Sequence, residues 1–331
     1  MAEAVDIRDL ENSGAPAPFV RSIGWVMLAM LAAFLINNAL VVGYGFPYAM
    51  TILSGGGGAA MVTVGIYLIG LIGAILYTFR SSGTSLRQDA RRITNFNIYL
   101  IRAVFWAVFL VGIADSTIAL LRAENLLTGF VGEDLAKSLN LAKFVGSRVH
   151  LPLVAAGFVI AYFTRTLGFL WLALMIVAAE LSIVISRFVF SYEQALMGDL
   201  VRYWYAALFL FASSYTLFED GHVRVDVFYA GFKDKTRGFV NALGSLALGA
   251  TTMWVVLWIG FNGKQSIINA PVMNFEITQQ GGVGMYVKYQ MAAFLGIFAA
   301  TMLIQFVAFF FEAVADFRDE PGKRQTAEVT H

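Results

Sequence analysis

Long, nearly uncharged apolar runs recur along this chain, and they limit the folds open to it more than any other feature. A helix needs about 20 consecutive apolar residues to cross the ~30 Å hydrocarbon core of a bilayer. The runs that approach or reach this length are residues 22–42, 59–79, 98–121, 167–187, 201–218, 238–260 and 288–314. Charged residues make up only 14% of the chain and hydrophobic residues 59%, whereas soluble domains carry about 25% charge. We therefore expect an all-α, polytopic membrane protein.

One further span depends on residues 147–164. The uninterrupted apolar part, Leu151–Phe163, holds 13 residues and would extend only about 20 Å as a helix. Either the helix continues back through Arg148 and His150, whose side chains would then snorkel to the interface, or the segment lies in the interface. An interfacial segment would place the arginine-rich connection 80–97 outside the cell. We therefore predict that the segment spans, which gives about eight transmembrane helices.

The distribution of basic residues predicts the orientation of these spans. With eight spans, 15 of the 23 Lys and Arg residues lie on the side that holds both termini, and 8 lie on the other side. Loops rich in Lys and Arg remain cytoplasmic, so both termini are expected in the cytoplasm. The first 20 residues are polar and acidic and lead into a 21-residue apolar run. This pattern indicates a retained helix and not a cleaved signal peptide.

Several kinds of chemistry are excluded by residues that the chain lacks. It has no cysteine, so disulfides, iron–sulfur clusters and thiolate zinc sites are impossible. It has no nucleotide-binding phosphate loop. The topology places His150 and His222 on opposite sides of the membrane and His331 in a tail, so they cannot share one metal or haem. We predict no enzyme activity, no cofactor, and no catalytic or metal-binding residue. The net charge of +1 gives no basic field that would bind nucleic acid.

Ionisable side chains inside the predicted spans need an explanation, because each costs at least ~2.5–3.5 kcal/mol there. For Glu180, near the middle of 167–187, two interpretations are open: an ion or proton site, or a hydrogen bond to a neighbouring helix. Arg187 lies on the same helical face. For Asp115, towards the outer end of 98–121, the alternatives are a sodium site and an interfacial contact. Secondary transporters usually bind substrate at interrupted helices, whereas the seven long apolar runs here have no internal proline. This favours a scaffold or partner subunit.

Three short motifs lie close together in the second half of the chain. They are RFVF from Arg187, DLVRY from Asp199, and GHVRVD from Gly221. In the third motif polar residues alternate with valines, so an extended segment would present one polar and one apolar edge to the headgroups.

These motifs, in this order and spacing, resemble the small membrane subunit of tripartite ATP-independent periplasmic (TRAP) transporters. The resemblance covers about residues 165–318. The expected organisation is a cytoplasmic tail at 1–21, an N-terminal extension with about four spans at 22–164, a four-helix core at 165–318, and a cytoplasmic tail at 319–331.

The resemblance implies a role in a multi-pass complex of the bacterial inner membrane. A periplasmic binding protein would deliver an organic acid, and a large membrane subunit would hold the substrate and sodium sites and move them. This chain would then be a stationary scaffold without a transport site. The candidate structural or interface residues are Arg187, Asp199, Arg202, Gly221, His222, Arg224, Asp226 and Glu180. Two other functions remain open: an autonomous carrier or channel, and a membrane anchor of a redox complex. The substrate is not identified, and a 2-oxo acid is a family-level guess.

Overall fold

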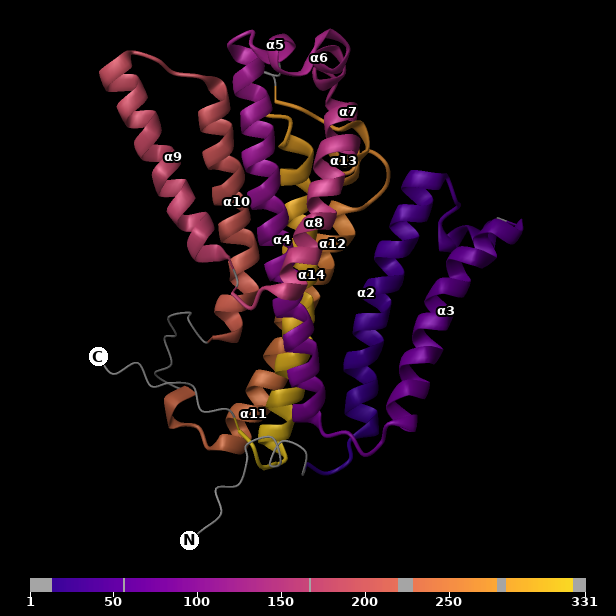
Figure 1. Ribbon diagram of the computed structural model, residues 1–331. Helices are drawn as coiled ribbons and strands as arrows, with labels where there is room; N and C mark the ends of the chain where they lie inside the picture. The colour runs from indigo at the N-terminus through magenta and orange to yellow at the C-terminus, as the bar shows by residue number, and fades with distance from the viewer. Residues whose placement is uncertain (1–13, 56, 167, 220–228, 279–283, 324–331) are drawn as a thin grey trace. The chain divides into compact units, whose positions relative to one another are not determined.

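The computed structural model describes residues 14–55, 57–166, 168–219, 229–278 and 284–323. These residues form helices and contain no β-strand, as expected for an all-α protein (Figure 1). Eight of their helices are long and apolar enough to cross a membrane, which confirms the predicted fold class.

The eight candidate spans start and end within a few residues of the predicted runs, except for one. They are α2 (Pro18–Tyr44), α3 (Gly57–Arg80), α4 (Leu86–Ala123), the continuous α7–η2–α8 (Ala142–Val145, Gly146–His150, Leu151–Phe163), α9 (Phe169–Phe190), α10 (Ala195–Phe218), the continuous α11–η4–α12 (Asp234–Leu243, Gly244–Ala250, Thr251–Gly260), and α14 (Lys288–Phe317). The shorter helices are η1 (Ala49–Ser54), α5 (Leu127–Val131), α6 (Glu133–Leu139), η3 (Tyr229–Gly231) and α13 (Asn269–Asn274).

The exception is α4, which begins well before the predicted run 98–121. The connection 80–97 was expected to be a loop, but α3 ends at Arg80 and α4 begins at Leu86. Its 38 residues extend about 57 Å, longer than the hydrocarbon core. The polar first turns of α4 therefore project beyond the span, and the arginines there are helical residues.

Two of the spans contain π-helical turns, η2 and η4. The sequence predicts uninterrupted helices, and the backbone does stay helical through both turns. A π-helical turn nevertheless widens the helix by one residue and is common at functional sites. The wider turn changes the face on which the following side chains lie, which matters for His150 at the end of η2.

The chain divides into two compact units, and each is described separately. Unit 1 comprises Met1–Asn97, Thr216–Leu257 and Met302–His331, and unit 2 comprises Ile98–Tyr215 and Trp258–Thr301. Both are assembled from segments far apart in the sequence. Residues on both sides of position 164 contribute to unit 2.

In unit 1 a buried guanidinium joins three consecutive helices. Arg21, in the first turn of α2, lies 2.6 Å from the carboxylate of Asp89 in α4, and both side chains are fully buried. Arg21 also donates to the carbonyl of Ser81, which follows α3, at 2.5 Å. The indole of Trp25 donates to the same Asp89 carboxylate at 2.8 Å. The first turn of α2 is thus fixed to the end of α3 and the start of α4.

A second buried arginine, Arg87, holds the far end of α14 in the same unit. Its guanidinium donates to Glu312 at 2.5 Å and to Asp316 at 2.9 Å, and also to the carbonyl oxygens of Glu320 and Pro321. Arg87 is one of the basic residues of the connection 80–97 on which the predicted orientation rests. The structure buries it, since four acceptors satisfy its donors.

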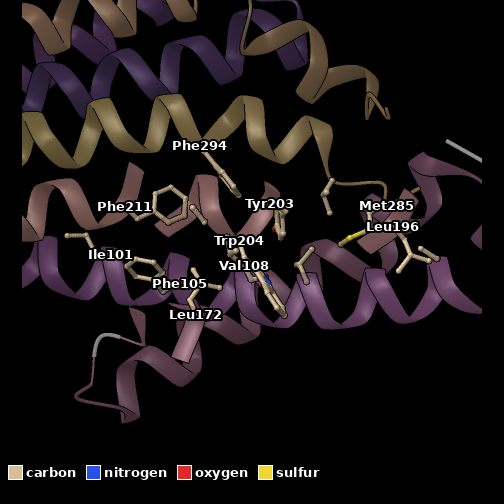
Figure 2. Close-up of a cluster of buried hydrophobic side chains, with 14 residues drawn as sticks. Ile101, Phe105, Val108, Leu172, Leu196, Tyr203, Trp204, Phe211, Met285 and Phe294 are labelled. Carbon is tan, nitrogen blue, oxygen red and sulfur yellow. The ribbon is translucent and has the colours of Figure 1, made fainter. Parts of the chain in front are cut away.

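Unit 2 is built around a cluster of aromatic and aliphatic side chains (Figure 2). Trp204 and Phe211 of α10 and Phe105 of α4 are almost completely buried there, together with Phe294 of α14. Leu172 of α9 completes the cluster, which therefore unites four spans. The fold thus buries aromatic rings between helices and not only against lipid.

Two close approaches in unit 2 require glycine. A Cβ atom on Gly112 of α4 would lie 2.1 Å from the indole nitrogen of Trp204, and one on Gly157 of α8 would lie 2.5 Å from the backbone nitrogen of Ala107. Small residues at such contacts let membrane helices approach closely.

Candidate functional site

The segment that leads into α14 is held by two aspartates from different helices. Asp199 of α10 accepts the backbone N–H of Met285 at 3.1 Å. Asp115 of α4 accepts the N–H of the next residue, Tyr286, at 2.6 Å. Both aspartates are buried, and their charges lie near the positive end of the α14 dipole, where carboxylates are favourable. No local pattern in the sequence links Asp115 to Asp199, and only folding brings the two carboxylates to adjacent amides.

A chain of buried polar side chains continues from Asp115. The Nε2 atom of His150 lies 3.3 Å from Asp115 Oδ1, and its Nδ1 atom lies 3.0 Å from the hydroxyl of Tyr289. The amide of Gln290 donates to that hydroxyl at 3.0 Å, and Gln290 accepts a hydrogen bond from Tyr203. These side chains, at most 9% exposed, connect α4, η2, α10 and α14.

These contacts are consistent with one tautomer of the His150 imidazole. Because Tyr289 accepts from Gln290, its own hydroxyl proton is free to donate to His150 Nδ1. A neutral imidazole that accepts at Nδ1 carries its proton on Nε2, which faces Asp115. The Nε2 atom of His150 and Oδ1 of Asp115 make this 3.3 Å contact without the geometry of a hydrogen bond.

Arg122, at the end of α4, binds the same segment from outside the network. Its guanidinium donates to the carbonyl of Gly284 at 3.3 Å and to that of Leu139 at 3.2 Å. It also lies 4.0 Å from the centre of the Tyr286 ring, within the range of a cation–π interaction. The residues just before α14 are thus held by backbone, charge and ring contacts.

The local sequence explains how His150 reaches this network. It ends the π-helical turn η2, which begins at Gly146. A Cβ atom at Gly146 would lie 2.2 Å from the ring of Phe275, so only glycine lets the helix approach this closely. The span continues back through Arg148 and His150, one of the two alternatives considered. The expectation that His150 snorkels is wrong, because its side chain is fully buried; Arg148 is exposed.

Three residues of the DLVRY motif, Asp199, Arg202 and Tyr203, lie close to the start of α14. Asp199 binds Met285, Tyr203 donates to Gln290, and Arg202 lies 3.7 Å from Asp199 while remaining largely exposed. All three therefore lie at or next to the contact with the start of α14. Arg187, by contrast, pairs with Glu193 at 3.6 Å, and both are exposed.

The remaining sequence candidates do not join this network. Glu180 is exposed on α9, and among the described residues no hydrogen bond or ion pair to it is found. Gly221, His222, Arg224 and Asp226 lie outside the described residues.

Sequence reasoning missed Tyr286, Tyr289 and Gln290 as functional positions. Gln290 could have been noticed, because it is a polar residue just inside the apolar run 288–314. The hydrogen bonds from the backbone N–H groups of Met285 and Tyr286 could not be predicted, because every residue other than proline has such a group. Among the described residues no group of three or more His, Asp or Glu side chains could hold a metal ion.

Comparison with known proteins finds a family match that covers part of this network, without Asp115 and His150. The family described as "Tripartite ATP-independent periplasmic transporters, DctQ component" matches residues 172–316. This stretch begins in α9, ends in α14 and includes Asp199, Arg202 and Tyr203. No curated protein and no solved structure was found to match the chain. The matched family is a transporter component and not an enzyme family. Residues 172–316 of this multi-pass membrane chain, which are less than half of it, are thus similar to the DctQ component of TRAP transporters.

Proposed function

We propose that this chain is the stationary scaffold of a TRAP transporter that imports an organic acid with sodium coupling. It works in the bacterial inner membrane, with both termini in the cytoplasm. A large membrane subunit holds the substrate and sodium sites, and a periplasmic protein delivers the substrate. The N-terminal segment 22–164 is part of the scaffold.

The observation that carries this proposal is that buried polar groups join segment 22–164 to the family region 172–316. The Asp115–His150–Tyr289 chain and Asp199 are committed to joining α4, α10 and α14. A scaffold must resist the forces of a moving partner, and buried hydrogen bonds between helices provide that rigidity. The same geometry brings residues of segment 22–164 into contact with the family region, which supports a common role.

The motif at 221–226 belongs to the proposal as a docking or orienting segment. His222 and Arg224 would face lipid headgroups or the large subunit, and Asp226 would pair with a nearby base. The double change His222→Ala, Arg224→Ala should reduce complex recovery or transport rate without a change in substrate preference. Normal complex yield with normal transport would contradict this assignment.

Reconstitution in liposomes tests the main proposal. Sodium-driven uptake of the organic acid should require this chain, the large subunit and the binding protein together, and this chain alone should transport nothing. Glu180→Gln and Asp115→Asn should at most lower complex yield, with the sodium Hill coefficient and substrate affinity unchanged. Uptake by this chain alone, or an altered sodium Hill coefficient with intact complex, would show that it holds a transport site.

A further inference from the structure

Helix α9 differs from the other spans in how little of it is covered by the rest of the chain. Only 6% of its apolar window is buried, against 17–67% in the other seven candidate spans among the described residues. Its first half packs on the unit 2 cluster through Leu172, Met175, Ile176 and Ala179. Beyond that point α9 diverges from α10 (Figure 1), and no residue from Glu180 to Phe190 is buried.

The exposed half of α9 begins with a carboxylate at the centre of the helix. Glu180 lies at the midpoint of the 22-residue α9, about 15 Å from either end, which places it at the depth of the bilayer midplane. Arg187 is engaged with Glu193. Lipid tails offer no hydrogen-bond donor, and an ionisable group at this depth costs at least ~2.5–3.5 kcal/mol.

One helical turn on either side of Glu180, the same face is apolar and open. Val177 is 64% exposed and Val184 is 48% exposed. Positions 177, 180 and 184 fall on one stripe of an α-helix. The stripe therefore offers an apolar surface with a single acceptor at its centre.

We infer that the stripe Val177–Glu180–Val184 docks a transmembrane helix of the large membrane subunit. That helix carries a Lys, Arg or neutral hydrogen-bond donor at the depth of Glu180. The inference rests on the proposed function and adds the surface by which the partner is held. Charge complementarity selects this occupant: two copies of this chain share one topology, so a two-fold contact through this stripe would bring two carboxylates together.

Co-purification with the large subunit tests the docking surface. Glu180→Leu should reduce the amount of large subunit recovered per small subunit about tenfold, as expected when a hydrogen bond to a charged group is lost. Glu180→Gln should reduce it less, because the amide can still accept a hydrogen bond. The yield of the free chain should stay the same or rise with Glu180→Leu, because the substitution removes a carboxylate from the hydrocarbon. Loss of complex is then not a folding defect.

A bulky substitution supplies the matched control. Val184→Trp should also reduce recovery of the large subunit, whereas Ile69→Trp, at the middle of α3 and 74% exposed, should not. A photo-crosslinking residue at position 184 should label the large subunit, and one at position 69 should not.

The outcomes separate the two proposals. Unchanged complex recovery in Glu180→Leu and Val184→Trp, with position 184 labelling only lipid or a second copy, would overturn the docking surface alone. Failure of the wild-type chain to bind the large subunit would overturn the proposed function, and this inference with it.

Discussion

At the scale of single residues, the contacts before α14 show how buried charge is used. Asp115 and Asp199 each accept one backbone N–H, and those donors belong to consecutive residues. When a buried N–H group loses its acceptor, the protein loses more stability than the hydrogen bond had contributed, because the N–H group stays buried without a partner. The two aspartates are therefore structural residues with separate but neighbouring partners.

We expect Asp115→Ala to lower the stability of the detergent-solubilised protein by about 1–3 kcal/mol, since Tyr286 N–H loses its acceptor in a buried site. Glu133→Ala is the control, because the Glu133 side chain is 77% exposed and pairs with the exposed Lys137. Thermal denaturation of both variants measures the difference. Equal melting temperatures for wild type and Asp115→Ala would refute the assignment.

Gly157 gives a second prediction at this scale. Gly157→Ala should destabilise the protein by about 1–3 kcal/mol, because the added methyl would overlap the backbone of Ala107 and force the helices apart. Gly73→Ala in α3 should be neutral or slightly stabilising, since nothing lies within 4 Å of that position and alanine favours helix. The same effect of both substitutions on the melting temperature would contradict the close packing of α8 on α4 at Gly157.

At the scale of elements, the spans themselves were predictable and their exact ends were not. The apolar runs predict seven of the eight spans, because membrane crossing fixes a length and a composition. The eighth, 147–164, was predicted from the arginine-rich connection 80–97. The first turns of α4 were missed because they are polar: Arg87 and Asp89 look solvated in the sequence but are buried by partners in α14 and α2. The π-helical turns were also missed, since no local residue pattern marks them.

The Arg21–Asp89 pair makes a prediction for the joining of α2, α3 and α4. Arg21→Met should cost about 3–5 kcal/mol, because the buried Asp89 carboxylate loses its buried cation and is left with the half-exposed Arg92 at 3.9 Å. The double change Arg21→Met, Asp89→Leu should cost less than the sum of the two single changes, since neither charge is then left unpaired. Thermal denaturation of the four proteins gives the coupling. Strict additivity would mean that the two side chains do not depend on each other.

At the scale of the whole molecule, the orientation in the membrane can be tested directly because the natural chain has no cysteine. Cysteines introduced singly at Ser82 and Lys235 should be protected from an impermeant thiol reagent in intact cells, and one at Ser138 should react. The reason is the excess of Lys and Arg on the side of Ser82 and Lys235. Labelling of position 82 from outside would reverse the topology of the N-terminal half.

The sequence by itself determined the class and the number of spans, and it predicted the similarity to the small TRAP subunit. Each depends on information local in the chain: runs of apolar residues, the distribution of charge, and short motifs such as DLVRY. Only the tertiary structure decided what the polar residues do. Asp115, Asp199 and His150 lie far apart in sequence, and two of the acceptors are paired with backbone amides, which any residue carries. The same holds for Glu180, whose exposure depends on how α9 diverges from its neighbours and not on the residues around it.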